Sequence, residues 1–174
     1  INPVSSCSYT ESTEFDPKQK AQYLTLSNNN STVERTDSSG SWNATVSKHV
    51  IRKGKFKLRF KFEAIKEASD VIVGVNNYQN NYKLTTCPLP GNDFCKSFYS
   101  YRANGELNLG ASTNIASANT GDTLTIEGNM YEKTLSFSLN DSNPTEGTIT
   151  DEELVVHVCL GCRVGNKVTL EYLC

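Results

Sequence analysis

The 174-residue sequence has nearly equal numbers of positive and negative side chains, and it has no long apolar run. Its net charge is −2, so we expect no nucleic acid as a partner, because phosphate binding needs a basic surface. No apolar run approaches the roughly 20 residues that cross a bilayer, so we expect no membrane partner either. The chain begins Ile-Asn-Pro without a methionine or a signal peptide, which indicates a fragment or a processed chain.

Histidines and catalytic motifs are also scarce. The two histidines are His49 and His157, and His157 lies in an apolar run, where a buried, hydrogen-bonded histidine is the expected role. A serine–histidine triad is defined by geometry, but no nucleophile-elbow motif supports one. Glu127 and Glu132 are the nearest approach to a glycosidase carboxylate pair, yet they flank a predicted turn. We therefore predict no enzyme activity and no cofactor.

Six cysteines leave two interpretations open. An even number suggests disulfides in a secreted chain, whereas free buried cysteines are common in cytosolic proteins. We favour reduced cysteines and a cytoplasmic location, with secretion as the alternative if they are oxidised. Cys159 and Cys162 have the spacing of half a zinc site, but no second close pair exists, so we predict no metal.

Alternating runs dominate the chain, and helical periodicity is almost absent. Between residues 55 and 65, apolar residues alternate with Lys, Arg and Glu, which predicts a long strand with one solvated face. Residues 121–140 predict a hairpin that turns at Gly128-Asn129. Its inward residues are predicted to be Leu124, Ile126, Leu135, Phe137 and Leu139.

Further runs complete the prediction of an all-β fold. Val71–Val75 and Leu154–Leu160 are continuously apolar, which indicates strands covered on both faces. Asp16-Pro17 predicts a helical turn over 17–22, the main exception to the β pattern. Ten or more short strands with frequent turn signals indicate one β-sandwich domain over residues 15–174, preceded by an N-terminal arm over 1–14.

The order of several motifs resembles the PRY-SPRY domain family, found in tripartite-motif ubiquitin ligases. The opening at residues 15–27 is similar to the PRY start, and the stretch from Ile51 to Val75 is similar to the start of a SPRY domain. Asn104-Gly105, Gly121-Asp122 and the segment 135–140 continue the resemblance, which covers residues 15 to 173. Relative to the family pattern, the segment from Cys87 to Cys95 is expected to be an insertion peculiar to this chain.

The resemblance implies a bent antiparallel sandwich of two sheets, of the concanavalin-like jelly-roll type. It also implies a non-catalytic module that binds a protein or peptide, which in a larger ubiquitin ligase would recognise the substrate. The oligomeric state is left open. The alternative is a secreted, lectin-like sandwich that binds glycans.

Tyrosines are the predicted ligand-binding residues, because tyrosine combines a large apolar area with a polar tip. Tyr78 and Tyr82 follow the Val71–Val75 run, while Tyr99 and Tyr101 lie in the strand predicted before Asn104. The family's ligand surface, matched residue by residue, adds two positions to these four. The predicted ligand-binding residues are Asn77, Tyr78, Tyr82, Tyr99, Tyr101 and Arg102. The competing interpretation is that Tyr99 or Tyr101 fills the core.

Overall fold

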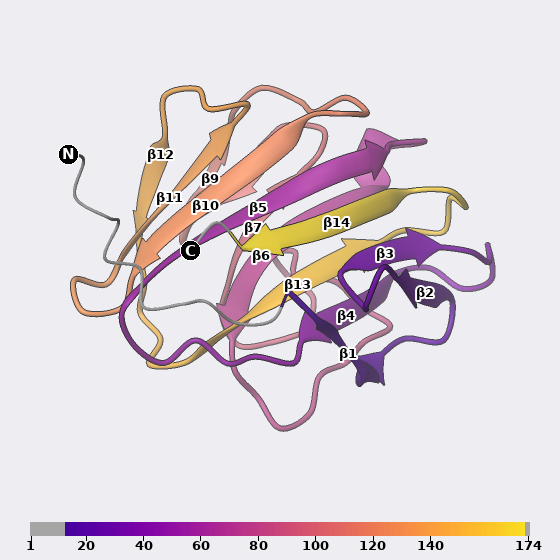
Figure 1. The fold of residues 1–174 in the computed structure, drawn as a ribbon, viewed down its shortest axis with the longest axis horizontal. Helices are drawn as coiled ribbons and strands as arrows, with labels where there is room; N and C mark the ends of the chain where they lie inside the picture. Colours follow the sequence, from indigo (N-terminus) through magenta and orange to yellow (C-terminus); the bar gives the residue numbers. More distant parts are fainter. Residues whose placement is uncertain (1–12, 173–174) are drawn as a thin grey trace.

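The computed structural model describes residues 13–172, and its regular secondary structure is almost entirely β-strand (Figure 1). Fourteen strands form two antiparallel sheets of seven strands each. Within the described residues the one helical element is η1, a 3-10 turn at Ala68–Asp70. The arm predicted over residues 1–14 lies outside the described residues except for its last two positions.

The two sheets are called sheet A and sheet B here. Sheet A has the order β1-β4-β13-β6-β7-β8-β9, and its strands are β1 Phe15–Lys20, β4 Asn43–Ser47, β6 Val71–Asn77, β7 Phe98–Arg102, β8 Glu106–Asn108, β9 Ser112–Asn114 and β13 Leu154–Leu160. Sheet B has the order β12-β11-β10-β5-β14-β3-β2, and its strands are β2 Leu24–Ser27, β3 Thr32–Arg35, β5 Lys55–Ala64, β10 Thr123–Asn129, β11 Thr134–Leu139, β12 Thr145–Thr148 and β14 Lys167–Tyr172.

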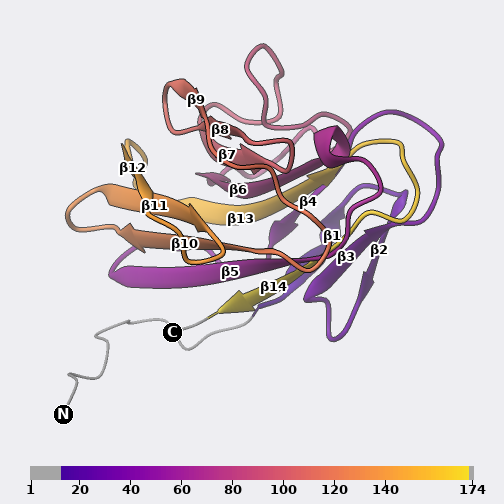
Figure 2. The ribbon, with the colours of Figure 1, turned by 90° about the horizontal axis from the view of Figure 1, so that it is seen from above.

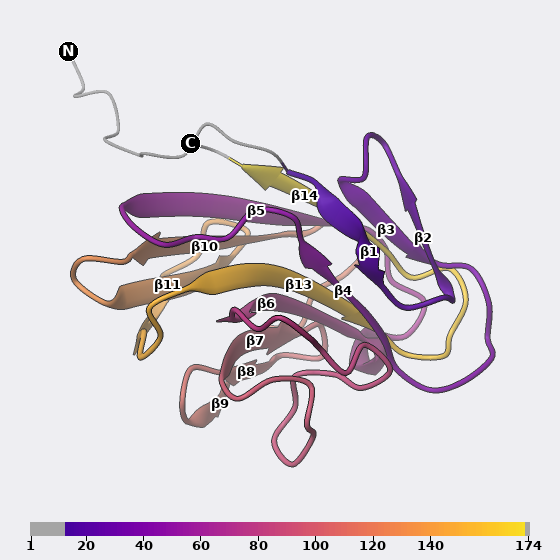
Figure 3. The ribbon, with the colours of Figure 1, turned by 90° about the horizontal axis from the view of Figure 1, so that it is seen from below.

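The sheets stack as two layers, which Figures 2 and 3 show from opposite sides. The main core lies between them, because alternate residues of each strand point inward and exclude water. Sheet B contributes the inward residues of β5, and all five inward residues predicted for the 121–140 hairpin are at most 6% exposed. This part of the sequence-based prediction is confirmed.

Gly128 occupies a position that leaves room for an aromatic ring. It pairs across the sheet with Phe56, and a Cβ atom at Gly128 would lie 2.1 Å from Cζ of Phe56. The Phe56 ring is 1% exposed, so it covers the glycine from the core side. The glycine was predicted to form the hairpin turn, but it belongs to β10, and the turn comes later, at residues 130–133.

The helical turn predicted over residues 17–22 is wrong, because the segment forms edge strand β1. Phe15 is fully buried in the main core, and β1 pairs with β4, so burial and backbone pairing outweigh the local signal at Asp16-Pro17. Asp16 Oδ1 accepts a hydrogen bond from the backbone nitrogen of Lys18 at 2.9 Å, a local turn within the edge strand. Pro17 is tolerated there because an edge strand leaves some N–H groups unpaired.

Residues 78–97, which connect β6 to β7, are called the cover loop. The loop projects from the outer face of sheet A in both side views (Figures 2 and 3). A second apolar cluster holds it on the sheet. Tyr82, Cys87 and Phe94 of the loop pack there against residues of β4, β6 and β13, namely Ala44, Val46, Ile72, Val155 and Cys159. Sheet A is therefore covered on both faces over β13 and β6, as their continuous apolar sequences predicted.

Gly128→Ala is expected to lower the free energy of unfolding by about 1–3 kcal/mol, because the added methyl group collides with the Phe56 ring. Phe56→Leu removes that ring, so the double variant should lose less stability than the sum of the two single variants. Urea denaturation of the four proteins measures the coupling. Strictly additive losses would contradict the cross-strand contact.

Candidate binding groove on sheet A

Strand β7 presents two different faces. Tyr99 and Tyr101 point into the main core and are 3% and 0% exposed, whereas Ser100 and Arg102 lie on the outer face of sheet A. Successive side chains of a strand point to opposite faces, so once Tyr101 faces the core, Ser100 and Arg102 must face outward. The outer face therefore receives the small and charged residues of β7.

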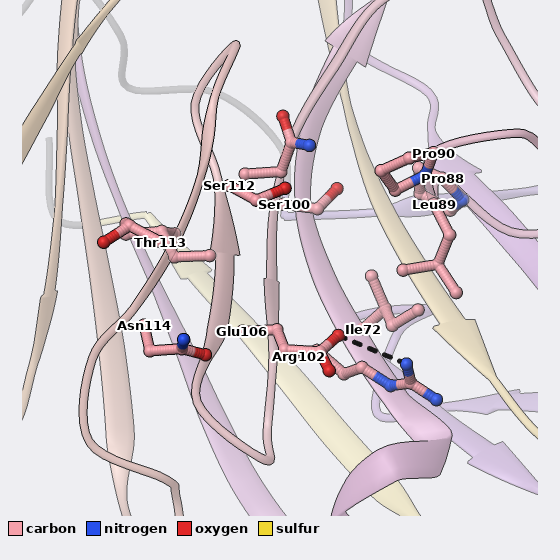
Figure 4. Close-up of a pocket in the computed structure, with 12 residues that line it drawn as sticks. Ile72, Pro88, Leu89, Pro90, Ser100, Arg102, Glu106, Ser112, Thr113 and Asn114 are labelled. Carbon is pink, nitrogen blue, oxygen red and sulfur yellow. Dashed lines mark hydrogen bonds and ion pairs between the residues drawn. The ribbon is translucent and has the colours of Figure 1, made fainter.

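The outward residues of β7 form the floor of a groove, which Figure 4 shows in close-up. Its volume is about 320 Å³, within the range of ligand pockets in proteins. We call it the β7–β9 groove. Its lining residues are Ile72, Pro88, Leu89, Pro90, Ser100, Arg102, Glu106, Leu107, Asn108, Ser112, Thr113 and Asn114. One wall comes from the cover loop and is apolar, while the opposite wall comes from β8 and β9 and is mostly polar.

A second hollow of about 310 Å³ adjoins the groove. The two share Pro90 and Asn108, and the second is also lined by Phe98 and Tyr99 of β7 and by Thr148 and Thr150, so it lies between the start of β7 and the end of β12 in sheet B. Two adjoining hollows form an elongated surface, which suits an extended ligand better than a compact one.

Arg102 is held in place at one end of the groove. Its Nε donates to the carbonyl oxygen of Ser69 at 2.6 Å, and its Nη1 lies 3.3 Å from Oε2 of Glu106 (Figure 4). Its guanidinium group also lies 5.6 Å from the centre of the Trp42 ring, a cation–π distance. These contacts fix the orientation of the side chain, so it is preorganised to meet a ligand.

A buried row of polar side chains supports the groove floor. Nε2 of His157 lies 2.9 Å from Oγ of Ser100, and Nδ1 lies 2.9 Å from Oδ1 of Asn76. The row crosses three strands. His157 pairs across the sheet with Gly74, which in turn pairs with Ser100. A Cβ atom at Gly74 would lie 2.0 Å from the carbonyl oxygen of Tyr99, so the glycine allows β7 to approach β6 closely.

The tautomer of His157 follows from its partners. Nδ2 of Asn76 donates to the carbonyl oxygen of Asn77 at 3.0 Å, so Oδ1 faces the imidazole as an acceptor. Nδ1 therefore carries the proton, and the Ser100 hydroxyl donates to Nε2. Burial lowers the pKa of His157 to about 3, so the ring is neutral at physiological pH.

This connectivity is that of a serine–histidine–amide triad, but a ring with so low a pKa is a poor general base. His157 matches the buried, hydrogen-bonded histidine expected from the sequence. Phe94 packs edge-on against it with 6.0 Å between the ring centres, which closes the row under the cover loop.

The structure separates the six residues predicted to bind the ligand. Arg102 lines the groove. Tyr99 and Tyr101 belong to the main core, where the Tyr99 hydroxyl donates to Asp151 at 2.9 Å and the Tyr101 hydroxyl donates to the carbonyl oxygen of Ala116 at 2.7 Å. Tyr99 also lines the second hollow, beside Thr148 and Thr150. Burial raises the pKa of both tyrosines.

Asn77 and Tyr82 hold the base of the cover loop. Oδ1 of Asn77 accepts from the backbone nitrogen of Ser97 at 2.9 Å, which joins the two ends of the loop. Tyr82 stacks on Phe94 with 5.5 Å between ring centres, and burial raises its pKa to about 12.

Tyr78 is 38% exposed and lies at the other end of β6 from the groove's Arg102. Asn76 pairs with Phe98, whereas Ile72 pairs with Arg102, so Tyr78 lies beyond the far end of β7. The guanidinium group of Arg52 is 5.9 Å from the centre of its ring. Tyr78 and Arg102 therefore belong to separate parts of the surface.

Sequence reasoning missed most of the groove's lining. Pro88, Leu89 and Pro90 lie in a segment recognised only as an insertion, and Ser112–Asn114 form edge strand β9 from small polar residues without apolar alternation. One sequence signal could have indicated the groove floor, namely the alternation in β7. If Tyr99 and Tyr101 face inward, Ser100 must face outward.

Other candidate sites have simpler explanations. Glu127 lies 3.1 Å from Nζ of Lys57 on the outer face of sheet B, a solvated ion pair. Within residues 13–172, no group of three or more His, Cys, Asp or Glu residues is placed to hold a metal ion. No helix in that range has the length and apolar character to span a membrane. The described cysteines, Cys87, Cys95, Cys159 and Cys162, are free thiols.

Comparisons with known proteins concern the fold. No family model matches the sequence, and no curated protein sequence matches it. Among solved structures, the SPRY domain of human HERC1 aligns with a TM-score of 0.71 and 20% identity, covering 91% of this chain and 98% of that one. A human SPRY domain aligns at 0.62 with 18% identity, covering 86% and 95%. The PSpry domain of TRIM65 aligns at 0.63 with 13% identity, covering 91% and 89%.

The chain therefore has the fold of a SPRY domain. Coverage of nearly the whole of each neighbour shows that both sheets are shared, and the all-β sandwich predicted from the sequence is confirmed. At these identities the likeness concerns the fold, so the groove is argued from this chain's own residues.

Acidification is expected to destabilise the protein through His157. Its folded pKa is about 3 and the unfolded value is about 6.5, so the unfolded chain binds the extra proton between these values. Stability present above pH 6.5 is therefore lost as the pH falls, by up to about 1.4 kcal/mol per unit.

Denaturant unfolding at pH 7, 6 and 5 of the wild-type protein and of His157→Gln measures this effect. The variant should be less stable at pH 7, because it loses the buried hydrogen bonds of the imidazole, and should show a shallower pH dependence, because it lacks the group that is protonated only in the unfolded chain. Equal slopes would contradict a buried neutral histidine.

Proposed function

We propose that this chain is a protein-interaction module that binds an extended segment of a partner polypeptide in the β7–β9 groove. The observation that carries the proposal is the groove's construction, with an apolar wall facing a polar wall over a fixed floor. The SPRY fold supports it, because SPRY domains serve as protein-interaction modules. In a parent chain that carries a ligase module, this domain would select the substrate.

The two walls offer complementary contacts to a peptide. Pro88, Leu89 and Pro90 provide apolar area for a side chain, while Ser112 and Asn114 provide hydrogen-bonding groups. Strand β9 is also the edge of sheet A, and all its residues are exposed. The backbone of a bound segment could therefore pair with β9, a common mode of peptide recognition.

The six residues predicted from the sequence have distinct parts in this proposal. Arg102 contacts the ligand at the end of the groove, where its fixed guanidinium group can bind a carbonyl or carboxylate oxygen. Tyr78 offers a second, separate contact surface. The remaining four act by positioning, since they are engaged in the core or in the base of the cover loop, namely Asn77, Tyr82, Tyr99 and Tyr101.

Selection of binders from a random peptide library tests the proposal, followed by titration calorimetry with matched variants. Ser112→Tyr places a large ring at the exposed rim of the groove and should weaken binding at least about tenfold, equivalent to about 1.4 kcal/mol. Thr134→Tyr makes a comparable change at an exposed position of sheet B and should leave binding unchanged.

Both substitutions favour β-structure, so both variants should keep the wild-type melting temperature. Equal affinity of Ser112→Tyr and the wild type for every selected peptide would place the site elsewhere. Binding to a glycan array with no selected peptide would favour the lectin-like alternative and overturn the proposal.

A further inference from the structure

Two buried cysteines meet where the cover loop contacts sheet A. Cys87 belongs to the loop and Cys159 to β13, and both are fully buried in the second apolar cluster. Sγ of Cys159 donates to the carbonyl oxygen of Thr86 at 3.4 Å, and Thr86 directly precedes Cys87 in the chain. The two side chains therefore lie close together in one small buried cluster at the base of the loop.

Cys87 is the member of the pair that the cover loop carries. Nδ2 of Asn92 donates to its Sγ at 3.3 Å, and Asn92 is an exposed residue of the same loop. The neighbouring Cys159 side chain and the Asn92 amide lower the pKa of Cys87, whereas burial raises the pKa of Cys159. Because the thiolate is the reactive form of cysteine, Cys87 is suited to react first.

The other described cysteines lie in different surroundings. Cys95 donates to the carbonyl oxygen of Ser97 at 3.2 Å, and burial raises its pKa to about 12, which suppresses its thiolate. Cys162 is exposed beyond the end of β13, so its reaction with an oxidant serves as the reference for an accessible surface thiol. Neither has the paired arrangement of Cys87 and Cys159.

We propose that Cys87 and Cys159 are an oxidation site at which a small-molecule disulfide of the glutathione type converts the two thiols into a disulfide. The bond would tie the cover loop to β13. The proposal does not depend on the peptide-binding function, because it rests on the thiol pair alone.

The reaction proceeds by two thiol–disulfide exchanges. Cys87 is fully buried while the cover loop lies on sheet A, so it meets the oxidant when the loop opens locally. Its thiolate then attacks one sulfur of the oxidant, so a bond forms to that sulfur, the oxidant's S–S bond breaks, and one small thiol leaves after taking up the proton that Cys87 lost. Cys159 then loses its proton and attacks Sγ of Cys87, which expels the second small thiol with that proton. The protein loses two electrons and two protons, and the oxidant gains them.

The disulfide would fix one wall of the β7–β9 groove. Pro88, Leu89 and Pro90 follow Cys87 directly, so a covalent bond at Cys87 limits their movement away from the sheet. The bond joins residues far apart in sequence, which restricts the unfolded chain, and the melting temperature should rise by roughly 5–10 °C.

The test uses the intact folded chain, treated with oxidised glutathione, alkylated at its remaining free thiols, digested and analysed by mass spectrometry. A peptide linked between Cys87 and Cys159 is expected in the wild type and in the control variants Cys95→Ser and Cys162→Ser. In Cys159→Ser, Cys87 should instead retain one glutathione, because the second exchange cannot occur.

The result for the wild-type protein is sufficient to test the proposal, even if a variant does not fold. Alkylation of both Cys87 and Cys159 after oxidation would overturn the proposal, as would a linkage from either of them to another cysteine. Linkage of the pair only after denaturation would also overturn it, because the folded contact would then have no part in the pairing.

Discussion

The contact between Phe94 and His157 anchors the cover loop to the outer face of sheet A, and the candidate site depends on this anchorage. The loop brings an aromatic pair, Tyr82 and Phe94, onto a sheet face that is otherwise polar along the row Asn76–His157–Ser100. Apolar contact alone would not hold a loop over such a row. The row is tolerated because each buried polar group in it has a partner.

This arrangement links burial to recognition. The neutral imidazole uses both nitrogens within the sheet, so Ser100 is fixed at the groove floor with its hydroxyl hydrogen turned away from the ligand. Arg102 lies two residues further along β7, on the same face, and is fixed by Ser69, Glu106 and Trp42. The floor is therefore rigid, and the variable part of the site is the loop-borne wall. The thiol pair lies under that wall, which is where a covalent bond would have most effect.

The sequence was sufficient to predict the framework. Strand Leu154–Leu160 has the predicted bounds, and Tyr99 and Tyr101 lie in a strand before Asn104 as predicted, because continuous or alternating apolar residues determine which faces are buried. The assignment of Tyr99 and Tyr101 to the ligand surface followed from the general preference of tyrosine for interfaces and, for Tyr101, from the family resemblance. Alternation shows that Tyr99 and Ser100 face opposite ways, but only the packing of both sheets decides which of them faces the core.

The groove itself could not be predicted from the sequence. Its walls come from residues 88–90 and 112–114, which carry no strong periodicity and meet only because the cover loop folds back over β6. The helical turn expected at Asp16-Pro17 failed for a related reason, since burial of Phe15 and pairing with β4 outweighed a local signal. Local patterns define the strands, whereas the site arises from contacts distant in sequence.

Backbone amide chemical-shift mapping with a library-selected peptide tests the central claim most directly. The account predicts that the largest shifts occur at Ser100, Arg102 and Ser112–Asn114, with smaller shifts in the cover loop. The largest shifts at Glu127 and its neighbours on sheet B, or around Tyr78 and Arg52 alone, would contradict a ligand in the β7–β9 groove.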